Sequence, residues 1–308
     1  MNRLTLKHLR YFLALTNHGQ LTKAAEACAI SQPAMSQQIK QFEDIIGQPI
    51  LERTSRGLEL TALGRSIESK ALEIVQSVDE LSNFVRANEG ELYGELRLGV
   101  IPTVAPYLLP KLIQGFAQRL PRVELAVRET ITPTLSSELE NGTIDAAIVA
   151  LPIAGSDFYE TPLFSESFVL VQPEDARGKP LPDISELRQM RLLLLEEGHC
   201  FRDQTLELCD LGSRETQKIM SGSSLSTLVQ MVAAGLGVTL IPEMSAEIEA
   251  RTAPVVTSRL DTLDARRDIG LVWRRSNPLH QHFQQLVEIV RDVATDIYDQ
   301  PRLLGCQS

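Results

Sequence analysis

The chain has 308 residues, 43% of them hydrophobic and 23% charged, with a formal net charge of −10. This length predicts two or three domains, and the composition is typical of a globular protein. No run of about 18 apolar residues occurs, so we expect no membrane span. Residues 1–8 lack the apolar core and cleavage site of a secretory signal. We therefore expect a cytoplasmic protein with no membrane partner, in which the four cysteines are mainly reduced.

The charge is unevenly distributed along the chain. Residues 1–60 contain seven Lys or Arg and five Asp or Glu, a balance of +2, so the remainder carries −12. Only the N-terminal part therefore has a charge suited to a phosphate backbone.

Three short helices are predicted in this N-terminal part, over residues 6–18, 21–29 and from Ser31 onward. Ser31 is a suitable N-cap, and Pro33 is tolerated in a first helical turn. The third helix turns its apolar residues inward, which leaves a polar face free of acidic side chains. That face consists of Gln32, Ser36, Gln37, Gln38 and Lys40. A solvated surface is the alternative, but the arrangement favours a helix-turn-helix with this face in the DNA major groove.

A β-wing is predicted to follow. Residues 49–53 and 57–60 flank Thr54-Ser55-Arg56, so Arg53 and Arg56 are available to phosphates or the minor groove. Residues 1–60 thus form a predicted winged helix-turn-helix domain.

A long helix is predicted over residues 61–88. Apolar or small residues recur along it at spacings that alternate between four and three positions, as in a heptad seam. The seam consists of Leu60, Gly64, Ile67, Ala71, Ile74, Val78, Leu81 and Val85. The helix could pack on its own domain, but we expect it to dimerise. A dimer would also match two half-sites on DNA.

Strands alternate with helical segments from residue 91 to the end, which predicts α/β lobes with parallel sheets. The expected strands cover residues 96–101, 123–128, 145–150, 167–172, 192–195, 238–241 and 269–274. Ligands in such sheets bind at the carboxyl ends of strands, where Thr103, Thr132 and the segment 223–227 fall. Each hydroxyl taken alone is more often a helix cap than a ligand contact.

The candidate reactive group is Cys200. Four leucines at 192–195 predict a buried strand, and a helix is expected from His199, so Cys200 falls in its first turn. There the backbone N–H groups, the helix dipole and the neighbouring Arg202 favour a thiolate. Cys209 lies nine residues further on, about 13 Å along a helix and half a turn around it. A disulfide needs Cα atoms about 4.4–6.8 Å apart, so the pair could bond only if the helix broke.

These residues alone favour a simpler interpretation, in which Cys200 and Cys209 are two unrelated thiols. No glycine-rich phosphate loop and no Cys/His spacing typical of zinc occurs in the sequence. Adjacent side chains usually point apart, so His199 and Cys200 are a poor nucleophile pair. We predict neither enzymatic activity nor a metal or cofactor. Cys28 and Cys306 are assigned no sensory role.

Several motifs resemble the LysR-type transcriptional regulators over the whole chain. They include Ala24-Ala25-Glu26, the run 30–36 and Leu51-Glu52-Arg53. The runs 101–110 and 198–204 are similar to those of the peroxide-sensing members of the family. The resemblance implies a winged helix-turn-helix, a linker helix at 61–90 and a regulatory domain at 91–308. That domain would have two Rossmann-like lobes, as in periplasmic binding proteins, lobe I at about 91–163 and 268–300 and lobe II at about 164–267.

The same resemblance implies a function. Cys200 would be the peroxidatic cysteine, oxidised to a sulfenic acid before it forms a reversible disulfide with Cys209. The matching peroxide-pocket residues are Thr103, Thr132, His199, Arg202, Asp203 and Arg267, and the matching DNA-contact residues are Gln32, Pro33, Ala34, Ser36, Gln37 and Arg53. The implied partners are hydrogen peroxide as signal, promoter DNA of antioxidant genes, RNA polymerase, a cellular thiol reductant and further copies of the chain, up to a homotetramer. The expected role is that of a transcriptional activator.

The sequence departs from the family pattern at two places, Pro133 and Lys218-Ile219, where a well-known enterobacterial member has histidines. Hydrogen bonding in the pocket and peroxide sensitivity are therefore open. The main alternative is a LysR-type regulator that binds a small metabolite between its lobes. A thiol peroxidase is a third hypothesis, which the DNA-binding half disfavours.

Overall fold

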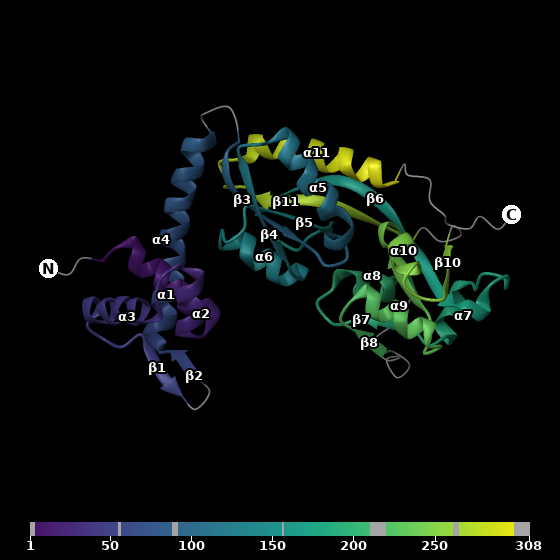
Figure 1. Cartoon of the computed structure of the whole chain (residues 1–308), viewed down its shortest axis with the longest axis horizontal. Helices are drawn as coiled ribbons and strands as arrows, with labels where there is room; N and C mark the ends of the chain where they lie inside the picture. The colour runs from purple at the N-terminus through teal and green to yellow at the C-terminus, as the bar shows by residue number, and fades with distance from the viewer. Residues whose placement is uncertain are drawn as a thin grey trace. The chain divides into compact units, whose positions relative to one another are not determined.

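The computed structural model describes residues 4–54, 57–87, 92–155, 157–209, 220–260 and 265–298. The chain divides into two compact units, residues 1–85 and 86–308 (Figure 1). The division falls inside a helix, so the expected domain limits at residues 60 and 90 stay a prediction. Arg56 and Cys306 lie outside the described residues. In the described part of the chain, every helix is too short or too polar to cross a bilayer.

The first unit is a winged helix-turn-helix. Helices α1 (Leu6–His18), α2 (Leu21–Ala27) and α3 (Gln32–Ile46) precede the strands β1 (Leu51–Thr54) and β2 (Gly57–Leu60), which pair antiparallel. Thr5 caps α1 and Ser31 caps α3 through their side-chain oxygens, as N-cap residues do. The Phe12 and Phe42 rings, 5.5 Å apart at their centroids, form the centre of the core. Three helices and the wing were therefore predictable from caps and apolar spacing.

Helix α4 (Ala62–Ala87) follows the wing and packs tightly on it. A Cβ at Gly64 would lie 2.1 Å from the carbonyl oxygen of Ile50, so only glycine fits at this approach. The first half of the predicted seam is used within the unit, where Ala71 is buried and Ile67 packs against the core. The second half is exposed, with Leu81 at 63%. Packing of the helix on its own domain is therefore confirmed for the first half, and the dimer contact stays a prediction for the second half.

The second unit contains a seven-stranded mixed sheet. Its strands are β3 (Gly94–Val100), β4 (Val123–Glu129), β5 (Ala146–Leu151), β6 (Phe158–Pro173), β9 (Thr239–Pro242), β10 (Val255–Arg259) and β11 (Arg266–Arg274). The order is β10-β6-β11-β5-β3-β4, with β9 also on β6. Strand β3 is parallel to β4 and β5, whereas β11 is antiparallel to β5 and β6. The expected lobed α/β fold is confirmed, but the expectation of purely parallel sheets is wrong.

The sheet is mixed rather than parallel because the long strand β6 runs through both halves of the unit, the half with β3, β4 and β5 and the half with β9 and β10. Its first part, to Ser167, pairs with β11, and its last part, from Phe168, pairs with β9 and β10 (Figure 1). The apolar pattern revealed only the second part, since the first part alternates with polar residues. A small parallel sheet, β7 (Leu193–Leu195) with β8 (Met220–Gly222), lies in the same half as β9 and β10.

Helices cover these sheets. They are α5 (Ala105–Arg119), α6 (Thr132–Glu140), α7 (Ile184–Gln189), α8 (Cys200–Leu208), α9 (Leu225–Ala233), α10 (Glu243–Ala250) and α11 (His280–Tyr298), with a 3-10 turn at Glu174–Ala176. Figure 1 shows α5 and α11 on the half built from β3, β4 and β5, and α8, α9 and α10 on the other.

The exposed half of α4 predicts a dimer contact. Leu81→Glu places a charge on the apolar stripe and should raise the dimer dissociation constant at least about tenfold, because a charge cannot be buried unpaired without a large cost. Analytical ultracentrifugation of the full chain measures this constant. Ser69→Glu is the control, since it adds the same charge at an exposed position about 120° around the helix. Equal constants for both variants and the wild type would exclude a contact through this face.

Candidate functional site

Cys200 is the first residue of α8, as expected. The buried β7 ends at Leu195, and the chain turns through Gly198, whose φ is +92°. A Cβ at Gly198 would lie 2.7 Å from Cδ1 of Ile131, so glycine is required both by the backbone conformation and by this contact. Cys200 is partly buried, and Phe201 behind it is 2% exposed. The turn therefore places Cys200 at a helix N-terminus, with Gly198 against Ile131, the N-cap of α6.

Cys209 lies at the opposite end of the same helix, as its C-cap. It is 2% exposed, its carbonyl oxygen accepts a hydrogen bond of 2.8 Å from Nε of Arg188, and burial raises the pKa of its thiol. Cys28, Cys200 and Cys209 all carry free thiols among the described residues. With α8 intact, about 13 Å of helical rise separates Cys200 from Cys209, well beyond disulfide reach.

A buried ion pair lies behind the turn between β7 and Cys200, residues 196–199, which is called the reactive turn below. Arg267 on β11 and Glu166 on β6 approach to 2.6 Å, and both side chains are fully buried. The guanidinium donates through Nη1 to Oγ1 of Thr103 at 2.8 Å and lies 5.1 Å from the centroid of the Phe201 ring. Because Thr103 accepts this hydrogen bond, its own hydroxyl proton is available to a ligand.

Two cavities border the turn and divide the predicted pocket residues between them. The first, of about 350 Å³, is lined by Thr103 and His199 together with Thr130, Ile131, Ser224 and Glu249. The second, of about 470 Å³, is lined by Cys200 and Asp203 together with Pro152, Phe168, Gln204 and Arg266. The adjacent residues His199 and Cys200 thus face different cavities, as adjacent residues were expected to do.

The other predicted pocket residues occupy different positions. Arg202 donates to the carbonyl oxygen of Leu195 at 2.8 Å, so it holds the end of β7. Thr132 begins α6; its Oγ1 is buried and has no hydrogen-bond partner within the described ranges. A small polar ligand would satisfy that oxygen. Arg267 is buried at 2% exposure and acts on the first cavity only through Thr103.

Several polar residues at this site were not predicted from the sequence. Glu249 is 4% exposed, and its Oε1 accepts hydrogen bonds from Tyr107 at 2.6 Å and Ser226 at 2.9 Å. Glu166 was also missed. An acidic residue two positions from both Phe164 and Phe168, and so on the same face of the strand, is a weak signal of such a buried ion pair. Its partner, 101 positions away, could not be identified.

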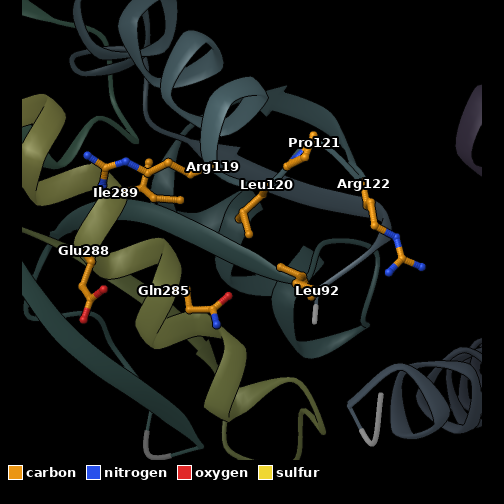
Figure 2. A pocket seen from close by; sticks show the side chains of 8 residues that line it. All are labelled: Leu92, Arg119, Leu120, Pro121, Arg122, Gln285, Glu288 and Ile289. Carbon is orange, nitrogen blue, oxygen red and sulfur yellow. The ribbon is translucent and has the colours of Figure 1, made fainter. Parts of the chain in front are cut away.

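A further cavity, of about 400 Å³, lies elsewhere on the unit, between the end of α5 and α11. Figure 2 shows its apolar floor, Leu92 and Leu120, and the guanidinium groups of Arg119 and Arg122 pointing away from each other. Arg119 pairs with Asp292 at 2.6 Å. None of the predicted site residues lines this cavity.

The predicted DNA-reading face is present on α3. Gln32, Pro33, Ser36, Gln37 and Lys40 are exposed and Ala34 is partly so, while Met35 and Ile39 are buried beneath them. The backbone of Arg53 lies on β1; its side chain falls outside what the structure describes.

His199 gives the regulatory unit a pH dependence. Burial lowers its pKa, an effect that the charge of Glu196 partly opposes. A group whose pKa is lowered by folding stabilises the fold above its unfolded pKa, here about 6.5, and this contribution disappears as the pH falls through the folded value. In His199→Gln the free energy of unfolding should therefore fall less than in the wild type as the pH drops below ~6.5. Urea unfolding at pH 5.5 and 7.5 measures this difference. His18→Gln, in the other unit, is the control. An unchanged pH slope in His199→Gln would contradict the assignment.

Comparisons with known proteins identify the family. Residues 6–65 match the bacterial regulatory helix-turn-helix protein model of the lysR family, and residues 89–295 match the LysR substrate binding domain. The chain is 36% identical to the DNA-binding transcriptional dual regulator OxyR of Escherichia coli K12 over 94% of this chain and 95% of that protein. It is 34% identical to the hydrogen peroxide-inducible genes activator of Pectobacterium carotovorum over 94% and 96% of the two chains.

Solved structures give the same result. A full-length OxyR variant from Pseudomonas aeruginosa has a TM-score of 0.71 at 33% identity, covering 94% of this chain and 95% of that chain. A peroxide-bound OxyR cysteine variant from Corynebacterium glutamicum has a TM-score of 0.66 at 32% identity, covering 96% and 94%. Both domains of these regulators are present in one chain in the same order. The chain belongs to the LysR family of DNA-binding transcriptional regulators, which are not enzymes, and is OxyR-like within it.

Proposed function

We propose that this protein is a hydrogen-peroxide-responsive transcriptional activator in which Cys200 senses the oxidant. The observation that carries the proposal is the placement of two free thiols at the two ends of one short helix, with Cys200 beside a cavity at the N-terminus. The similarity to hydrogen peroxide-inducible activators supports the identity of the signal.

The first step is a nucleophilic attack. The Sγ of the Cys200 thiolate attacks one peroxide oxygen, the S–O bond forms as the O–O bond breaks, and hydroxide leaves and takes up a proton. The N–H groups at the start of α8 stabilise the thiolate. Because Thr103 and His199 line the first cavity and Cys200 and Asp203 line the second, the proposed peroxide position is at the turn that both cavities border. There the hydroxyls of Thr103 and Thr132 are the proposed donors to the peroxide oxygens, directly or through a water molecule, and His199 and Asp203 complete the polar surroundings.

The second step joins the two cysteines. Sγ of Cys209 attacks the sulfenic sulfur of Cys200, the S–S bond forms, and the sulfenic oxygen leaves as water. Burial raises the pKa of Cys209 and the helix holds it out of reach, so this step requires α8 to unwind. The refolded segment then changes the regulatory unit and, through it, the contacts with DNA. A cellular thiol reductant exchanges with the disulfide to reset the protein.

The remaining parts of the proposal follow from the family. The protein acts in the cytoplasm on promoter DNA of antioxidant genes, contacts RNA polymerase, and assembles through α4 into dimers and then a homotetramer. The residues proposed to face DNA are Gln32, Pro33, Ala34, Ser36, Gln37, Lys40 and Arg53.

Mass spectrometry of the reduced protein after near-equimolar hydrogen peroxide tests the redox steps. We expect a Cys200–Cys209 disulfide in the wild type, a stable oxidised Cys200 in Cys209→Ser, and no response in Cys200→Ser. Cys28→Ser is the matched control and should behave as the wild type. A promoter response to peroxide that persists in Cys200→Ser would show that another residue senses the oxidant.

A second candidate function is control by a small metabolite in the first cavity. One observation favours it: the buried Glu249 lines that cavity, and its Oε2 has no hydrogen-bond partner in the described part of the chain. Such an oxygen would accept a hydrogen bond from a ligand donor. Cysteines that stay reduced at near-equimolar peroxide would favour this candidate.

The DNA-contact assignment has its own test. Lys40→Ala should weaken binding to all DNA sequences and lower by about 1 the slope of the logarithm of the binding constant against the logarithm of the salt concentration. Gln37→Ala should reduce the binding free energy by ~1–3 kcal/mol only for DNA that carries the base pair contacted by Gln37. Fluorescence anisotropy at several salt concentrations measures both. Lys179→Ala removes one exposed charge from the other unit and should change neither quantity. An unchanged salt slope in Lys40→Ala would remove Lys40 from the phosphate contacts.

A further inference from the structure

Glu166 lies at the centre of a buried network that links the reactive turn to the C-terminal helix. Both of its oxygens are fully used. Oε1 accepts from Nε and Nη2 of Arg267 at 2.9 and 2.6 Å, and Oε2 accepts from the backbone N–H of Met244 at 3.0 Å and the hydroxyl of Tyr298 at 3.1 Å. Four donors around one carboxylate leave it a single orientation.

The orientation of Glu166 determines that of Arg267. Two of the guanidinium nitrogens are held by the same carboxylate oxygen, so the guanidinium plane is fixed. The remaining contacts follow from that plane: Nη1 and Nη2 donate to Oγ1 and the carbonyl oxygen of Thr103 at 2.8 and 3.2 Å, and the cation lies over the Phe201 ring. Arg267 thereby fixes Thr103 on one side and the residue after Cys200 on the other.

Tyr298 adds a third attachment. It is in the last turn of α11, and its ring contacts Phe164 with centroids 5.7 Å apart. Its hydroxyl is one of the two donors to Oε2, so α11 contributes directly to the orientation of the carboxylate. Strand β6 and the consecutive C-terminal elements β11 and α11 thus determine the geometry of the loop that carries Thr103.

We propose that Glu166 and Tyr298 are positioning residues for the reaction of Cys200 with peroxide. This inference rests on the proposed function. Glu166 holds Arg267 so that it donates to Thr103, which directs the Thr103 hydroxyl proton away from Arg267 and toward the peroxide. Tyr298 keeps Glu166 in that orientation and makes the end of α11 part of the sensor.

The test compares two reactions of the same thiol in the full-length reduced protein. Peroxide needs the positioned donors, whereas iodoacetamide needs only an accessible thiolate, so a general structural defect changes both rates and a positioning defect changes only the first. Rates at Cys200 are followed by peptide mass spectrometry over pH 6–9 with hydrogen peroxide or iodoacetamide.

Tyr298→Phe removes a single hydroxyl and should slow oxidation about three- to tenfold, with alkylation unchanged within about twofold. Glu166→Gln replaces one carboxylate oxygen with an NH2 group, so that the N–H of Met244 and the hydroxyl of Tyr298 face a donor instead of an acceptor. This variant should slow oxidation more than about tenfold. Glu166→Asp keeps the charge with a shorter reach and should recover part of the rate.

Matched controls remove similar groups elsewhere in the unit. Tyr159→Phe deletes a tyrosine hydroxyl on the same strand as Glu166, and Asp145→Asn changes a partly buried ion pair, that with Arg97. Neither should change the ratio of oxidation to alkylation. If Glu166→Gln does not fold, Tyr298→Phe decides the question.

An unchanged ratio in Tyr298→Phe and Glu166→Asp, in a protein whose wild type oxidises normally, would overturn the positioning role and leave the proposed function standing. A wild type whose Cys200 does not react with peroxide would instead overturn the proposed function itself.

Discussion

The buried ion pair of Arg267 with Glu166 is the interaction on which the regulatory unit depends. Both side chains are removed from water, and removing one partner of such a pair costs about 3–5 kcal/mol because the other charge is left uncompensated. Both charged groups have further hydrogen-bond partners, Thr103 for Arg267 and Met244 and Tyr298 for Glu166, which offset the cost of their burial. It joins β6 to β11 where the two halves of the sheet meet, so the stability of the fold and the geometry of the reactive turn have the same origin.

Helix α8 provides the second constraint. It is long enough to hold Cys200 and Cys209 apart and short enough to be lost at a modest cost. Its nine residues exceed two turns only slightly, and helices of that length are marginal without tertiary contacts. It packs on the rest of the unit through the buried Phe201 and Thr205. The Phe201 ring lies 4.8 Å from the Phe168 ring, between centroids, and beneath the guanidinium of Arg267. In the proposed mechanism a disulfide forms at the expense of this helix, so oxidation would be coupled to a change of conformation.

The DNA-binding unit is built on a different principle. Its helices are capped by side chains close in sequence, and its core is a local cluster around Phe12 and Phe42. Such a unit can form from nearby interactions alone, and α4 begins as part of it before extending beyond it. One half of α4 therefore packs on the core of this unit, whereas Leu81 in the other half is exposed.

The sequence by itself determined the elements whose information is local. Caps and apolar spacing predicted α1, α3 and α4, the leucines at 192–195 predicted the strand before the reactive turn, and the start of α8 at Cys200 followed from the residues after it. Tertiary structure decided what depends on distant partners. The antiparallel insertion of β11 beside β5 could not be seen from the chain, because strand direction is set by connection and packing rather than by periodicity. The same holds for Glu166 and Tyr298, whose partners are 101 and 132 positions away and were brought together only by the folded sheet.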